Sequence, residues 1–163
     1  MVWINWEIFT DKWLQRAEKK RVYIDDGDRF ISLWIAFNGW MRGRFGEDKA
    51  DRFQIDSVKG MRDFRDVFDK LRMEDPNFIR QLDELERFLV VDMRFRNGRE
   101  EIFRYEGTFE SLIELIYQVR CNLFHGRKNI EEDRKDFKLV RLSYRILSPL
   151  FKTYLSTNPP QAQ

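Results

Sequence analysis

The segment "RFISLWIAFNGWMRGRFG", residues 29–46, constrains the fold of this chain more than any other. Its apolar residues repeat at the intervals of three and four that mark one face of an α-helix, and this stripe consists of Phe30, Leu33, Trp34, Phe37 and Met41. Further apolar side chains at positions 31, 35 and 40 lie off the stripe, so a helix here would be apolar on most sides and would need cover from other helices. This predicts the central helix of an all-α bundle, with Gly46 as its end.

The same period recurs along the chain and predicts a single helical domain of about five to six helices over residues 1–155. Apolar residues between positions 3 and 17 predict the first helix, and a single helix is expected within Asp48–Met73. Start signals mark three others: Asp28 as cap of the central helix, Asp75 with Pro76 before a helix that runs to Leu89, and Thr108 before a fifth.

Three further boundaries follow from turn and capping residues. Asn129 with Glu132 three residues later predicts the start of the last helix. The turn pair Asn97-Gly98 predicts a short hairpin or ordered loop near residues 92–106. The final residues, 156–163, are expected to form a disordered tail.

Composition narrows the class of protein. One cysteine permits no internal disulfide, which is typical of a reducing compartment. The chain has no run of eighteen apolar residues and no signal-peptide pattern at its start, so we expect a cytoplasmic protein without a membrane partner. Charged residues make up 36% of the chain, yet the net charge is only +2, because acids and bases are interleaved. This balance neither predicts nor excludes binding of a nucleic acid.

The segment "YQVRCNLFHGRK", residues 117–128, holds the only histidine, His125, and the only cysteine, Cys121. One residue of each kind cannot make a usual zinc site, and no phosphate-cradling glycine pattern occurs, so we expect neither a metal nor a cofactor. Cys121 and His125 are four residues apart and could form a nucleophile pair. Nothing in the sequence marks the orienting group or oxyanion hole that such chemistry requires.

Arg120 and His125 form the other chemically sensible pair. An imidazole can transfer a proton near neutral pH, and a guanidinium can hold a phosphate through a bidentate fork. Arg127 and Lys128 add positive charge beside them. The two residues diverge by ~140° on an ideal helix, so they converge only if the helix end distorts or a second copy contributes. From the residues alone, a basic cluster that complements the helix dipole, with His125 capping or packing, is the favoured alternative.

A resemblance to a known family changes that balance. The residues "RCNLFH", 120–125, match the R-x4-H motif of the HEPN superfamily, and "RFISLWIAFNGWMR" resembles the apolar second helix of a prokaryotic HEPN branch. The resemblance extends over residues 6–154 and is specific in these two segments. It implies a helical bundle that dimerises with its motif helices facing each other. Many members are metal-independent ribonucleases of toxin–antitoxin and other defence systems.

The resemblance also implies roles for individual residues. Arg120 would contact the scissile phosphate, and His125 would assist proton transfer while the RNA 2′-hydroxyl attacks and leaves a 2′,3′-cyclic phosphate. The family often has a polar residue directly after the arginine, whereas here Cys121 holds that position and Asn122 follows. Asn122 is therefore expected to support the site. Independently of the resemblance, Asn38 could reach the site from the central helix, although a satisfied core amide is favoured, and Trp34 and Trp40 are expected in the core or at a dimer contact.

These implications lead to an expected endoribonuclease, with RNA and a second copy of the chain as partners. An antitoxin or a nucleotidyltransferase is a further candidate partner. The alternative is a non-catalytic HEPN-like interaction module that binds RNA, nucleotide or a partner protein.

Overall fold

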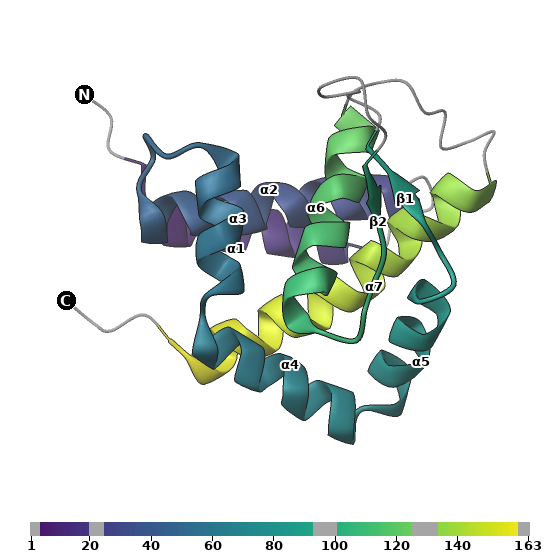
Figure 1. The fold of residues 1–163 in the computed structure, drawn as a ribbon. Helices are drawn as coiled ribbons and strands as arrows, with labels where there is room; N and C mark the ends of the chain where they lie inside the picture. Colours follow the sequence, from purple (N-terminus) through teal and green to yellow (C-terminus); the bar gives the residue numbers. More distant parts are fainter. Residues whose placement is uncertain (1–3, 20–24, 93–100, 125–133, 160–163) are drawn as a thin grey trace.

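The computed structural model describes residues 4–19, 25–92, 101–124 and 134–159 of the chain. These residues form one mostly helical domain with seven α-helices, rather than the five to six expected, and one two-stranded hairpin (Figure 1). The elements are α1 (Trp6–Glu18), α2 (Asp26–Phe45), α3 (Asp51–Lys59), α4 (Arg62–Glu74), α5 (Pro76–Leu85), β1 (Val90–Val91), β2 (Ile102–Phe103), α6 (Phe109–Phe124) and α7 (Arg134–Thr157).

Helix α2 is central, as its apolar character predicted. It packs against α1, α3 and α7, and the five residues of the predicted stripe are all at most 3% exposed. The cap predicted at Asp28 is wrong: Asp25 has the extended backbone of a cap, and its side chain accepts a 2.9 Å hydrogen bond from the Asp28 N–H. The predicted end is confirmed, because Gly46 follows the helix with a φ of 112° that glycine adopts without strain.

The single helix expected within Asp48–Met73 is two helices. Gly60 ends α3, where its N–H reaches back to the carbonyls of Asp56 and Ser57, and the extended backbone of Met61 starts α4. Glycine is a poor helix former, which favours a break here. The apolar period hid the break, because Val58 before it and Met61 after it both still face the core.

An aromatic cluster fills the space where α4 meets α2, α6 and α7. The ring of Phe64, on α4, is fully buried and stacks on Tyr154 at 4.3 Å between centroids and on Phe109 at 5.5 Å. Phe37 of α2 and Phe151 of α7 complete the cluster, with their centroids 5.1 Å apart. Aromatic pairs at these separations contribute packing energy beyond the area that they bury.

Asp75 forms a one-residue corner between α4 and α5. Its N–H donates to the carbonyl of Leu71 and so ends α4, while its carboxylate accepts from the N–H groups of Asn77 and Phe78 and so caps α5. Pro76 occupies the first helical position, as predicted. The predicted extension to Leu89 is wrong, because α5 ends at Leu85 and Leu89 is exposed.

A short antiparallel hairpin follows, which the turn pair had suggested. Val90 pairs with Phe103 and Val91 with Ile102, so the strands bracket the segment in which Asn97-Gly98 lies. That turn pair is outside the described residues. β-Branched residues at positions 90 and 91 fit an extended backbone better than a helix, which agrees with their place in β1.

Helix α6 carries the predicted motif and is the most enclosed of the helices described. Thr108 caps it as predicted, since its hydroxyl oxygen accepts from the Ser111 N–H at 3.1 Å. Figure 1 shows α3 along one side of α6 and the hairpin along the other, with α7 behind. As a result even polar residues of its second half, Gln118 and Asn122, are buried.

Helix α7 runs from Arg134 to Thr157 and continues through Pro149. It extends two residues into the segment expected as a disordered tail, and the Asn158 N–H still donates to the Tyr154 carbonyl at 2.9 Å. The start predicted at Asn129 and Glu132 is outside the described residues, as is the chain from residue 160 onward.

Candidate functional site

The structure describes the motif helix only as far as Phe124. Three of the predicted site residues, His125, Arg127 and Lys128, are therefore outside the described residues. The other three, Arg120, Asn122 and Asn38, are described. The candidate site is thus built here around Arg120.

Arg120 lies on aromatic rings on the side of α6 that faces α2 and α3. Its guanidinium carbon is 5.7 Å from the ring centre of Trp34 and 5.0 Å from that of Phe124. Cation–π contacts of this kind hold the planar group in a preferred orientation. Trp34 is 3% exposed, so it belongs to the core as expected and also forms the floor beneath the motif arginine.

The polar contacts of Arg120 are weak compared with what its guanidinium can make. One nitrogen is 3.5 Å from a carboxylate oxygen of Asp51, an ion pair longer than a good N–H···O hydrogen bond. Another nitrogen is 3.9 Å from the Cys121 sulfur, a weak acceptor. The buried Nε has no acceptor among the residues described, and neither has the indole Nε1 of Trp34. Unsatisfied buried donors are uncommon in folded proteins, but Arg120 is not alone in this chain, since the Nε of Arg29 also has no acceptor among the described residues.

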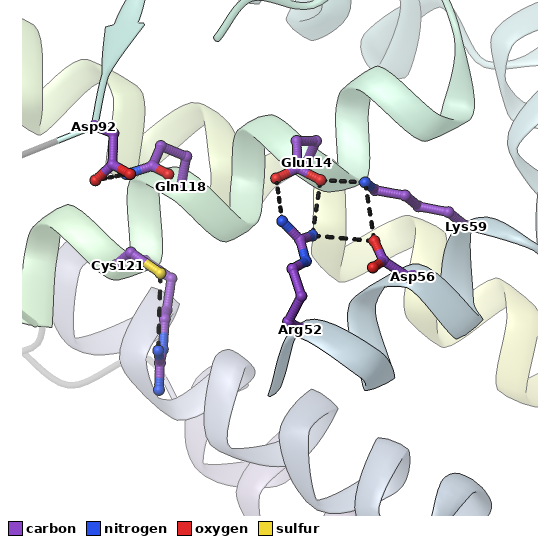
Figure 2. Close-up of polar contacts among 8 residues, drawn as sticks. Arg52, Asp56, Lys59, Asp92, Glu114, Gln118 and Cys121 are labelled. Carbon is purple, nitrogen blue, oxygen red and sulfur yellow. Dashed lines mark hydrogen bonds and ion pairs between the residues drawn. The ribbon is translucent and has the colours of Figure 1, made fainter. Parts of the chain in front are cut away.

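A second arginine between the same two helices shows the contrast. Arg52 of α3 forms a bidentate fork with Glu114 of α6, and both nitrogen–oxygen distances are 2.8 Å (Figure 2). Lys59 also pairs with Glu114, and Asp56 pairs with both cations. Arg52 thus has the partners of a structural arginine, whereas the polar contacts of Arg120 with the described residues are both long.

The carboxyl of Glu114 is an acid whose ionisation is coupled to folding. Burial alone would raise its pKa, but hydrogen bonds from Arg52 and Lys59 and their positive charges outweigh burial and leave the pKa below the ordinary value of 4.5. The Glu114 side chain is only 17% exposed, so solvent screens these contacts little. The charged carboxylate therefore links α6 to α3.

Replacing Glu114 with glutamine is expected to flatten the acid limb of the stability profile. In the wild type the folded-state pKa is lower than the unfolded one, so the unfolded chain binds more protons in acid. This contribution is present above the ordinary value of 4.5 and is lost as pH falls through the folded pKa. Denaturant titrations at several pH values between ~3 and 7 would measure it. Glu110→Gln, at a 43% exposed partner of Arg65, is the matched control; equal pH dependence in wild type and Glu114→Gln would contradict the expectation.

Asn122 lies on another side of α6 than Arg120, and it contacts both the hairpin and α6 itself. Its amide donates to the main-chain carbonyl of Val91 at 2.8 Å and its oxygen accepts from Gln118 at 2.9 Å. Gln118 also donates to Asp92, at 3.2 Å (Figure 2). These buried contacts attach the hairpin to the motif helix. The supporting role expected for Asn122 at the site stays a prediction.

A small cavity lies beside Asn122, between α6 and α7. Its lining includes Val119, Leu123 and Leu139, and its volume of about 20 Å³ is room for about one water molecule. This cavity is too small for a nucleotide. The candidate site is instead the partly exposed surface around Arg120 and Asp51.

Asn38 makes a polar contact away from Arg120, and Cys121 meets Arg120 only through the weak sulfur contact at 3.9 Å. The side-chain oxygen of Asn38 accepts from Arg42, one turn along α2, at 3.0 Å. Cys121 is 3% exposed; burial raises the pKa of its neighbour Tyr117, and Cys121 raises it further. A thiol enclosed in this way is poorly placed to attack a substrate.

Asp51 is the site residue that the sequence did not reveal. It lies in a mostly acidic, polar run, "EDKAD", that is typical of a solvated helix start. Its contact with Arg120 depends on the packing of α3 against α6, which no local pattern encodes.

Comparisons with family models, curated proteins and solved structures gave no match. Within the described ranges no helix has both the length and the apolar character needed to cross a membrane. The described residues also contain no cluster of three or more His, Cys, Asp or Glu side chains placed to bind a metal ion.

Proposed function

We propose that this protein is a metal-independent endoribonuclease of HEPN type that acts in the cytoplasm as a toxin or defence component. The proposal rests first on the motif "RCNLFH" at residues 120–125. One structural observation supports it. The motif arginine lies on two aromatic rings, a quarter exposed and with a single long ion pair to Asp51 among the described residues, while the neighbouring Arg52 forms a bidentate pair with Glu114.

The proposed chemistry uses a nucleophile that belongs to the RNA. The 2′-hydroxyl attacks the adjacent phosphate, and the bond from phosphorus to the 5′-oxygen of the next nucleotide breaks. His125 assists the proton transfer, and Arg120 stabilises the charge that develops on the phosphate oxygens. The products are a 2′,3′-cyclic phosphate and a free 5′-hydroxyl, so no cofactor takes part.

A dimer is part of the proposal. Phe124, at the last described position of α6, is 51% exposed although it is a large apolar residue next to the motif arginine. An exposed aromatic group at this place is suited to contact with a second motif helix. Two copies would supply two arginines and two histidines around one cleft, as a two-fold axis permits. An antitoxin or nucleotidyltransferase would then bind the dimer.

RNA cleavage is expected to persist in excess chelator and to leave 2′,3′-cyclic phosphate ends. The physical reason is that the attacking oxygen needs proton transfer and charge stabilisation, which side chains supply. Gel analysis of mixed RNA with and without EDTA, followed by identification of the product ends, would measure it. An oligonucleotide with 2′-deoxyribose at the cleaved position is the control and should resist. Loss of cleavage in EDTA with rescue by a divalent ion would contradict the proposal, and binding of RNA without cleavage would favour the interaction module.

A further inference from the structure

The carboxylate next to Arg120 comes from the start of a neighbouring helix. Asp51 is the first residue of α3, and no side chain caps that helix, because Ala50 occupies the cap position. The side chains of Asp51 and Arg120 are 31% and 26% exposed, so both groups reach solvent. The pair therefore lies at the surface of the junction between α3 and α6.

The geometry of this pair is that of a replaceable contact. A single oxygen of Asp51 meets a single nitrogen of Arg120 at 3.5 Å, whereas Glu114 grips Arg52 with two oxygens at 2.8 Å each. Partly exposed ion pairs with one long contact contribute little to stability. Opening the Asp51 contact therefore costs the fold little.

A phosphate diester fits this guanidinium better than Asp51 does. Its two non-bridging oxygens match the paired N–H groups along one edge of an arginine, a geometry that gives short and strong hydrogen bonds. In Arg120 the Nε–H is buried and has no acceptor among the described residues. The buried Nε–H is closed to a ligand, so a phosphate would bind the partly exposed Nη groups of Arg120, one of which faces Asp51 at 3.5 Å.

We propose that the Asp51 carboxylate is an internal competitor for the anion site of Arg120, which a phosphate group of the ligand must displace. Asp51 restrains the site by keeping the charge of Arg120 balanced until a stronger acceptor arrives. The inference rests on the proposed function in one respect, that Arg120 binds a nucleic-acid phosphate, and it does not depend on cleavage. The opposite role is that Asp51 positions Arg120 for its ligand, and it predicts the opposite sign on removal.

Equilibrium binding of a labelled 2′-deoxy oligonucleotide, which the proposed chemistry cannot cleave, tests the inference. Asp51→Asn is expected to tighten binding by about twofold to fivefold at moderate salt, the range for loss of a partly exposed ion pair. Asp56→Asn is the matched control: it removes the same charge from α3, but from a carboxylate that pairs with Arg52 and Lys59. It is expected to change binding less.

The same comparison in an Arg120→Gln background isolates the pair. In that background Asp51→Asn and Asp56→Asn are expected to change the affinity for the oligonucleotide equally. The reason is that the guanidinium for which the Asp51 carboxylate and the phosphate compete is gone. Circular dichroism of each variant checks that the helices remain folded. If both α3 substitutions tighten binding equally, the cause is the loss of one negative charge and not the contact with Arg120. If Asp51→Asn weakens binding, Asp51 is a positioning residue. Either of these outcomes, or a loss of binding in Asp51→Asn, overturns the inference. A failure of RNA cleavage alone would overturn the proposed function, but the binding comparison would still test the role of Asp51.

Discussion

Replacing Arg120 with alanine is expected to lower RNA cleavage by about 10²–10³-fold, the usual loss when a donor to developing charge is removed. Arg120→Lys is expected to restore only part of the activity, because an ammonium group lacks the planar fork. His125→Ala, in the same motif, is expected to lower cleavage by about 10²–10⁴-fold through loss of proton transfer. The measurement is single-turnover cleavage of a labelled RNA with enzyme in excess.

Arg65→Ala is the matched control for these variants. Arg65 pairs with Glu110, nearer the start of the same motif helix, so the change removes a cation that contacts α6 without touching the motif. Its cleavage rate should equal that of the wild type. Thermal unfolding of each variant separates catalytic from structural loss, a necessary check because Arg120 lies on the buried ring of Trp34. Wild-type rates in Arg120→Ala or His125→Ala would end the catalytic assignment and indicate a contaminating nuclease.

The second large effect concerns stability. Phe64→Ala is expected to lower the free energy of unfolding by about 3–5 kcal/mol, because it removes a fully buried ring and leaves a cavity. The lost ring packs against Tyr154, Phe109 and Trp40, which belong to three different helices, so the surroundings cannot easily collapse onto the gap. Urea titration followed by circular dichroism would measure the change.

Phe53→Ala offers the comparison within the same chain. Phe53 lies on α3 and is 51% exposed, so the same chemical change there should cost only about 0.5 kcal/mol or less. Similar losses for the two variants would show that the aromatic cluster around Phe64 does not form the core in solution.

Local sequence signals predicted the helices that have a clear apolar stripe or a capping residue of their own. The stripe of α2, the Asp75-Pro76 start of α5 and the Thr108 cap of α6 were confirmed because each depends on residues a few positions apart. The break at Gly60 was missed because both flanking helices present apolar residues to one core, so the period continues across it. The cap of α2 was misplaced because three aspartates compete within "DDGD" and only the backbone decides which one is used.

The candidate site was only partly predictable for a different reason. The motif identified Arg120 by its type and spacing, but its partners Trp34 and Asp51 come from α2 and α3, far away in the chain. Asn122 was expected at the site because of its place in the motif; its contact with the carbonyl of Val91 could not be predicted, because it depends on how the hairpin packs on α6. The positions of His125, Arg127 and Lys128 stay predictions.

The attachment of the hairpin to α6 has a consequence for how sequences of this fold can diverge. Asn122 holds β1 through the main-chain carbonyl of Val91, an acceptor that every amino acid supplies. Position 91 can therefore accumulate substitutions without loosening the anchor, whereas position 122 cannot exchange its amide for an apolar group without stranding a buried carbonyl. Substitutions should therefore accumulate faster at position 91 of the strand than at position 122 of the helix.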